Sequence, residues 1–166
     1  MNTYLQLITF SIIIGIGATI VMDVYALFMK LVLKIPSLDM GLVGRWIGHF
    51  KHGVFAHQNI VQAERIKGER IIGWIAHYLI GISFAFLLLL ISGVEWAYKP
   101  TFLPALIIGV LTTAAPWLMM QPAFGFGIAA SKTPNPPIAR LRSMQAHAIY
   151  GIGLYLAALF LSTVIS

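Results

Sequence analysis

Three ionisable side chains lie inside long apolar segments of this chain, where they could form one polar site. Asp23, His77 and His147 each fall within a run of mostly aliphatic residues, and each run ends near a group of Lys and Arg residues. An ionisable group is costly to place in hydrocarbon, so such a residue is by default a candidate for function. These three residues are therefore the primary candidate site.

The three residues also share a depth within their segments. The nearest basic residue at the segment end is five or seven positions away, in the pairs Asp23 and Lys30, His77 and Arg70, and His147 and Arg142. At about 1.5 Å per helical residue, the side chains lie roughly 8–10 Å from the basic edge. We expect the carboxylate and the two imidazoles to converge at this level of a helical bundle.

Several chemistries fit such a group, and the sequence leaves them open. Two imidazoles and a carboxylate suit a transition metal such as iron, zinc or manganese, and nearby thioethers would favour Cu(I). The further ligand candidates approach the same level from the first and third segments, and they are Met22, Met119, Met120 and Gln121. The same groups could handle a proton or a substrate. They could also be a hydrogen-bonded trio that only joins helices, at about 1 kcal/mol per bond.

Haem b is a further alternative for the same histidines. His77 and His147 could be axial ligands, with Gly81 and Gly151 leaving room for the ring. The sequence contains no nucleophile elbow, phosphate-binding loop or dinucleotide fingerprint. We therefore make no prediction of enzymatic activity, and a non-enzymatic role is favoured.

A second group of histidines, His49, His52 and His57, lies between the first two apolar segments. His49 and His52 are three residues apart and could share a helix face. The simplest interpretation is a helix at the membrane surface whose histidines are partly protonated near anionic lipid.

The amino-acid composition indicates that lipid surrounds most of the protein surface. The chain has 166 residues, of which 59% are hydrophobic and only 10% charged. A soluble domain typically has about 25% charged residues. There is no cysteine, so disulfides and thiolate metal sites are excluded. The net charge of +6 lies beside apolar segments, which indicates membrane topology and not nucleic-acid binding.

The sequence predicts one all-α membrane domain over residues 1–166. Four segments approach the roughly 20 residues needed to cross a bilayer. They are residues 4–33, 71–91, 102–121 and 144–165, joined on one side by loops at 34–70 and 122–143. Helix is the required conformation, because an open strand would leave backbone groups unpaired in lipid.

Basic residues predict the orientation. Ten of the eleven Lys and Arg residues lie in or beside the two long loops, and only Lys99 lies on the opposite side. The positive-inside rule places those loops in the cytoplasm and both termini in the periplasm or outside the cell.

Both long loops carry structure of their own. Leu38, Leu42, Trp46 and Phe50 recur at helical spacing after the possible caps Ser37 and Asp39, which predicts an amphipathic helix on the cytoplasmic membrane face. The apolar stretch 123–130 could enter the membrane or cover the protein.

A weak internal repeat suggests two related helix pairs. Ala76-His77 precedes Gly81-Ile82 at the same spacing at which Ala146-His147 precedes Gly151-Ile152. Gly15 with Thr19 likewise resembles Gly109 with Thr113, and both are small-residue spacings that permit close helix approach.

Several runs of residues resemble the domain-of-unknown-function family 2938 over nearly the whole chain. They are Gly44-Arg45-Trp46-Ile47-Gly48-His49, Gly73-Trp74-Ile75-Ala76-His77-Tyr78, Ala115-Pro116-Trp117 through Met120-Gln121-Pro122, Gly127-Ile128-Ala129-Ala130-Ser131 and Gly153-Leu154-Tyr155. The resemblance implies a small bacterial inner-membrane protein with four spans. It implies no activity and assigns no catalytic residue.

The functional prediction is a multi-pass membrane protein that is transporter-like or binds a cation or metal at Asp23, His77 and His147. The alternative is an accessory or assembly protein in which the trio is structural, and a haem-binding or lipid- or quinone-acting enzyme is a third. The expected partners are membrane lipids and further copies of the chain, since four helices are too few to enclose a wide path.

Overall fold

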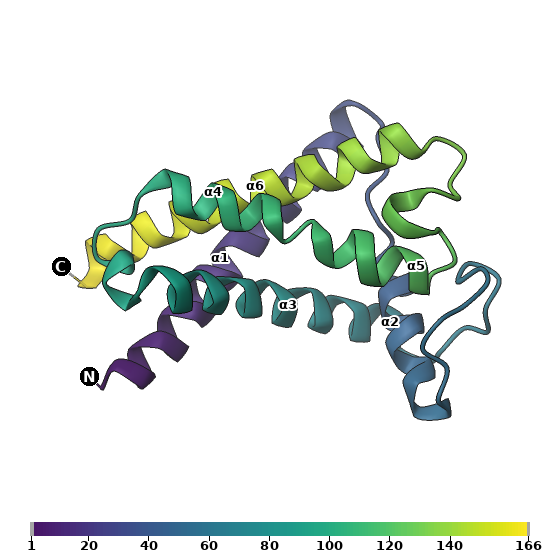
Figure 1. Ribbon diagram of the computed structural model, residues 1–166, viewed down its shortest axis with the longest axis horizontal. Coiled ribbons are helices and arrows are strands. Elements are labelled where there is room, and N and C mark those ends of the chain that lie inside the picture. Colours follow the sequence, from purple (N-terminus) through teal and green to yellow (C-terminus); the bar gives the residue numbers. More distant parts are fainter. Residues whose placement is uncertain (1, 166) are drawn as a thin grey trace. The chain divides into compact units, whose positions relative to one another are not determined.

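The computed structural model describes residues 2–165, and this part of the chain is helical without any strand (Figure 1). Four helical stretches are long and apolar enough to cross a membrane. They are α1 (Thr3–Val32), α3 (Glu69–Ser92), the stretch Phe102–Ala123, and α6 (Pro136–Ile165). The prediction of an all-helical fold with four candidate spans is confirmed.

Shorter elements complete the described chain, and they lie in the connections and within the third span. They are α2 (Met40–His49), η1 (Phe50–His52), η2 (Val94–Ala97), α4 (Phe102–Leu111), the π-helical η3 (Pro116–Met120), α5 (Gln121–Ala123) and η4 (Ile128–Ala130).

Two of the spans differ from their predicted form, and proline is the reason in both. The third span is not one regular helix, because α4 ends at Leu111 and a π-helical turn begins at Pro116. A proline lacks the N–H that the regular α-helical ladder requires. The fourth helix begins at Pro136, ahead of the predicted start near residue 144. Asn135 precedes it and accepts a bond from Ile138 N at 3.4 Å, and proline is well suited to a first helical position.

The chain forms two compact units, each assembled from separate stretches. Unit 1 comprises residues 1–37, 78–112 and 145–166, and unit 2 comprises residues 38–77 and 113–144. Asp23 and His147 belong to unit 1, whereas His77 belongs to unit 2.

Unit 1 has one apolar core, to which all four spans contribute. Its fully buried members include Ile14 of α1, Leu88 of α3 and Leu154 of α6. The same cluster joins the two chain ends to the short connection between α3 and α4, through Leu7, Val94, Trp96 and Ile165. Both ends of the described chain therefore lie with this short connection, as Figure 1 shows.

Two close helix crossings in unit 1 involve the glycines of the internal repeat. A Cβ on Gly15 of α1 would meet the Cα of Ile82 in α3 at 2.5 Å. A Cβ on Gly109 of α4 would meet the backbone of Gly151 in α6. Small residues allow helix backbones to approach in membranes. The first and second spans therefore pair in the same manner as the third and fourth.

Unit 2 is built around α2, which begins as its sequence suggests. The Asp39 side chain caps the helix by accepting from Gly41 N at 2.8 Å. Val43, Ile60 and Phe124 form the small core of this unit. The apolar stretch 123–130 contributes buried Phe124 and Ala130. The helix is present, and its position at the membrane surface stays a prediction.

We predict that Gly109→Ala destabilises the protein by roughly 1–3 kcal/mol, because the added methyl group collides with backbone that cannot move freely. In an ordinary helix interior the same change would stabilise by about 0.5–1 kcal/mol, so the sign of the effect is diagnostic. Thermal unfolding in detergent measures it. Leu111→Ala, at a side chain 63% exposed at the end of α4, is the control and should have little effect.

Candidate functional site

Asp23 is paired with a tyrosine from a neighbouring span. The hydroxyl of Tyr78 in α3 donates to Oδ2 of Asp23 in α1 at 3.0 Å. Both residues belong to unit 1. The carboxyl group is therefore tied to a group that can itself donate and accept a proton.

His147 is held by a hydroxyl from the third span. The Thr112 Oγ1 lies 2.9 Å from Nδ1 of His147 and donates to the carbonyl of Gly109 at 2.6 Å. A hydroxyl has only one proton, and the carbonyl can only accept it. Nδ1 must therefore donate to Thr112, which leaves Nε2 of a neutral His147 as a proton acceptor.

Further hydroxyl groups lie at the helix crossings between these two pairs. The Tyr150 hydroxyl of α6 donates to the carbonyl of Gly81 in α3 at 2.6 Å. Thr19 of α1 lies in the space that a Cβ on Gly81 would need, and it donates to Gly15 O at 2.8 Å. Unit 1 thus contains a polar layer across α1, α3 and α6 within an otherwise apolar core.

The other predicted ligands lie in different surroundings. His77 packs edge-on against Trp74 with ring centroids 5.6 Å apart. Met22 packs on the core of unit 1 and Met120 on the core of unit 2, whereas Met119 is 58% exposed. Gln121 is buried and donates to Ser143 Oγ at 3.2 Å.

The predicted residues do not form a recognisable metal centre. Within residues 2–165, no group of three or more His, Asp or Glu side chains is arranged to hold a metal ion. The pairs formed by Asp23 and His147 instead place one hydroxyl against each ionisable group.

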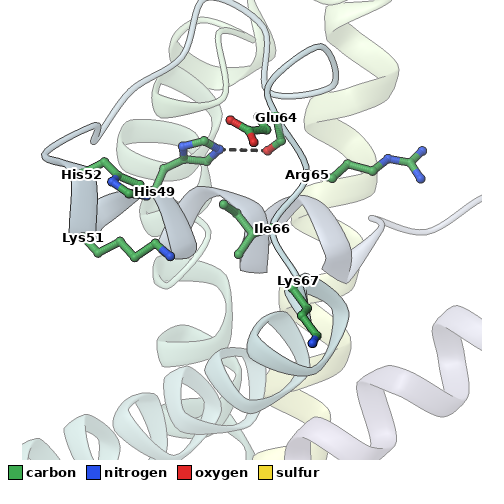
Figure 2. Close-up of a pocket in the computed structure, with 7 residues that line it drawn as sticks. All are labelled: His49, Lys51, His52, Glu64, Arg65, Ile66 and Lys67. Atoms are coloured by element: carbon green, nitrogen blue, oxygen red, sulfur yellow. Dashed lines mark hydrogen bonds between the residues drawn. The ribbon is translucent and has the colours of Figure 1, made fainter.

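The second histidine group lies together in unit 2. The His49 ring is 4.9 Å from that of His57 and 6.5 Å from that of His52, between ring centroids. Nε2 of His49 lies 2.9 Å from the carbonyl oxygen of Glu64. His49 and His52 also border an open pocket of 540 Å³ (Figure 2), lined in addition by Lys51, Glu64, Arg65, Ile66 and Lys67. Arg65 extends away from the histidines in that view, so the basic groups do not converge.

The surroundings of His57 change the pKa of its imidazole. Desolvation lowers the pKa of its imidazole, and the positive charge that His49 and Arg45 can carry lowers this pKa further. Nε2 of His57 is buried, and no group among the described residues accepts or donates a hydrogen bond there. The neutral form of His57 is therefore favoured.

Arg45 organises unit 2, a role that the sequence analysis missed. Its guanidinium makes a bidentate pair with Glu69, at 2.9 Å from Nε and 2.8 Å from Nη2. Nη1 also donates to the carbonyls of Ile60, Val61 and Ala63 at 3.0–3.3 Å. The Glu69 carboxylate raises the pKa of Arg45, so the charge is permanent. Arg45 is only 5% exposed, and no local sequence pattern signals the role, because its partner Glu69 lies 24 residues away.

The comparisons with known proteins identify a family and nothing more specific. The family described as "Protein of unknown function (DUF2938)" matches residues 12–161. The comparisons with curated proteins and with solved structures gave no match. The predicted resemblance is confirmed, and it assigns no activity.

We predict that Arg45→Met destabilises unit 2 by roughly 3 kcal/mol, because it leaves the Glu69 carboxylate and three loop carbonyls without their donor. The double variant Arg45→Met/Glu69→Gln should be less unstable than the sum of the single variants. Thermal unfolding of all three measures the coupling. Arg70→Met, at an exposed position, is the control. Additive effects would show that the pair is not coupled.

We predict that stability falls as the pH drops below the ordinary histidine pKa of 6.5, in part because of His57. The folded protein binds a proton at His57 less readily than the unfolded chain does, so acid favours unfolding. Melting temperatures measured between pH 7.5 and 5.5 should decline less steeply in His57→Gln than in the unsubstituted protein. His52→Gln, at an exposed histidine, should leave the slope unchanged.

Proposed function

The chain belongs to the family "Protein of unknown function (DUF2938)", and from that premise we propose that it is a transporter-like membrane protein that binds and releases a proton at Asp23. The observation that carries the proposal is the hydrogen bond between Asp23 and Tyr78. It places a carboxyl group and a phenol in contact between two helices that are long and apolar enough to cross a membrane.

The position of Asp23 supports a functional role over a purely structural one. Two apolar side chains of similar volume could pack between these helices at lower cost than a carboxyl group and a phenol. Ionisable residues at such depth are rare and mark ion pathways and proton relays. When Asp23 is ionised, the Tyr78 hydroxyl stabilises its charge by donating to it. When Asp23 is protonated, the same hydroxyl can accept a hydrogen bond from the O–H of the carboxylic acid.

His147 supplies a second protonation site in the same unit. Because its Nδ1 donates to Thr112, its neutral Nε2 is the atom that takes up a proton. Protonation at Nε2 leaves the bond to Thr112 intact. His77 directly precedes Tyr78 in the chain, and we include it in the proposal as a third protonation site.

The orientation and assembly belong to the same proposal. We place the two long loops in the cytoplasm of a bacterial cell, because ten of eleven basic residues lie in or beside them. Further copies of the chain would complete the path, since the exposed apolar residues on all four spans leave a large surface for lipid or for another copy.

We predict that the infrared spectrum of the reconstituted protein shows a carboxylic C=O band when Asp23 has taken up its proton. The band should be absent in Asp23→Asn and displaced in Tyr78→Phe, because the phenol bonds to this carboxyl group. Proteoliposomes that carry an imposed pH gradient should lose this gradient faster than empty liposomes do. Replacing Asp23 should slow the loss about tenfold relative to the unsubstituted protein.

Asp39→Asn is the matched control, since this aspartate only caps α2 and its replacement should change neither measurement. The accessory-protein alternative predicts a different result. In that case Asp23→Asn would lower the melting temperature, but no titrating band would be assigned to Asp23 and no gradient would dissipate. That combination of results would reject the proposal.

A further inference from the structure

The third span carries a column of polar side chains, each with one buried atom that has no hydrogen-bond partner among the described residues. Four buried side-chain atoms have no hydrogen-bond partner among the described residues. Three of them are Thr113 Oγ1, Trp117 Nε1 and Gln121 Oε1, all of unit 2. These residues recur at every fourth position, so they lie on one face of the helical stretch. Thr113 and Gln121 are only 3% and 7% exposed.

The backbone along this column is also short of donors. Pro116 and Pro122 have no N–H, so the carbonyls that precede them by one helical turn lose their regular partners. Between the two prolines the helix widens into the π-helical turn Pro116–Met120. Such turns are rare and occur frequently at functional sites. In a membrane, freed backbone groups of this kind are satisfied by neighbouring side chains or by ordered water.

The hydrogen-bond donors and acceptors of the column determine which kind of ligand it can bind. The indole N–H of Trp117 can only donate, the amide oxygen of Gln121 can only accept, and the Thr113 hydroxyl can do both. A cation would be repelled by the indole N–H. Among the described residues, no Lys or Arg side chain hydrogen-bonds to any of the three residues, so the column is not built for an anion. The ligand must therefore be uncharged, and it must both donate and accept.

The spacing identifies this ligand as water. Neighbouring groups of the column are about 6 Å apart along the axis, at 1.5 Å per residue. A water molecule that makes two hydrogen bonds of about 2.8 Å at its near-tetrahedral angle joins groups roughly 4.5 Å apart, so one or two water molecules span each interval. We propose that the third span binds a file of water molecules along Thr113, Trp117 and Gln121.

His57 extends this inference toward the loop. Its backbone N–H donates to the carbonyl of Ala123 at 2.8 Å, two residues beyond Gln121. Its buried Nε2 is the fourth unpartnered atom. The backbone of His57 is thus held beside the end of this column, and its neutral imidazole can also accept a hydrogen bond from water. The inference is independent of the proton site proposed at Asp23.

Nuclear magnetic resonance of protein labelled with 15N at its four tryptophans tests the proposal in nanodiscs. The indole proton of Trp117 should exchange magnetisation with water, and Trp117→Phe identifies its signal. Trp96 is the internal reference, because its indole N–H donates to Thr101 within the protein at 3.2 Å. If Trp117 shows contacts only with aliphatic protons, the proposal is wrong.

Thr113→Val gives a second test with a distinct sign. If water binds the hydroxyl, valine lowers the melting temperature, because the water loses a partner. If the hydroxyl is buried dry, valine raises the melting temperature, because an unpaired polar group is removed. A raised value would overturn the proposal. Thr112→Val is the control and should lower the melting temperature in both cases, since Thr112 bonds to Gly109 and His147. The resonance measurement still decides the matter if Thr113→Val does not fold.

Discussion

A polar group buried in hydrocarbon must find its hydrogen-bond partner inside the protein, and this constraint shapes the spans of the chain. The Tyr78 hydroxyl donates to Asp23, the Thr112 hydroxyl bonds to Nδ1 of His147, and the carbonyl of Gly81 accepts from Tyr150. Each of these bonds joins two different helices. The bonds therefore fix which helices are neighbours and at what register they meet, which the hydrophobic effect cannot do between helices that are apolar on every side.

Glycine makes these bonds possible, because it allows the helices to approach each other closely. A side chain on Gly81 would displace Thr19, and one on Gly109 would collide with Gly151 and with the carbonyl of His147. The first and second spans thus approach each other closely at glycine residues, and the third and fourth spans do the same. The polar pairs differ, with an acid and a phenol in one and an imidazole and a hydroxyl in the other.

The sequence was sufficient for those features that depend on local composition. Apolar length predicted the four spans, and the spacings of Gly15 with Thr19 and of Gly109 with Thr113 predicted that helices could approach closely there. The partners of Asp23 and His147 could not be predicted, because they depend on the register between helices. In the sequence, Arg45 was counted only as one of the basic residues that indicate membrane topology. Its bidentate pair with Glu69 bridges residues far apart in the chain, which no local pattern records.

The third span holds most of the buried side-chain atoms that lack a hydrogen-bond partner among the described residues. The first, second and fourth spans are continuous helices. Pro116 and Pro122 interrupt the third, which also holds three buried side-chain atoms without a hydrogen-bond partner in the described part of the chain. Each unpaired buried group would destabilise the fold by about 1–3 kcal/mol if it stayed dry. Ala at positions 113 and 121 would leave no unpaired side-chain group, and a span without Pro116 and Pro122 could be a regular helix. Polar residues and prolines at these positions are therefore best explained by a ligand that satisfies them, and the polar side chains of this span concern function more than stability.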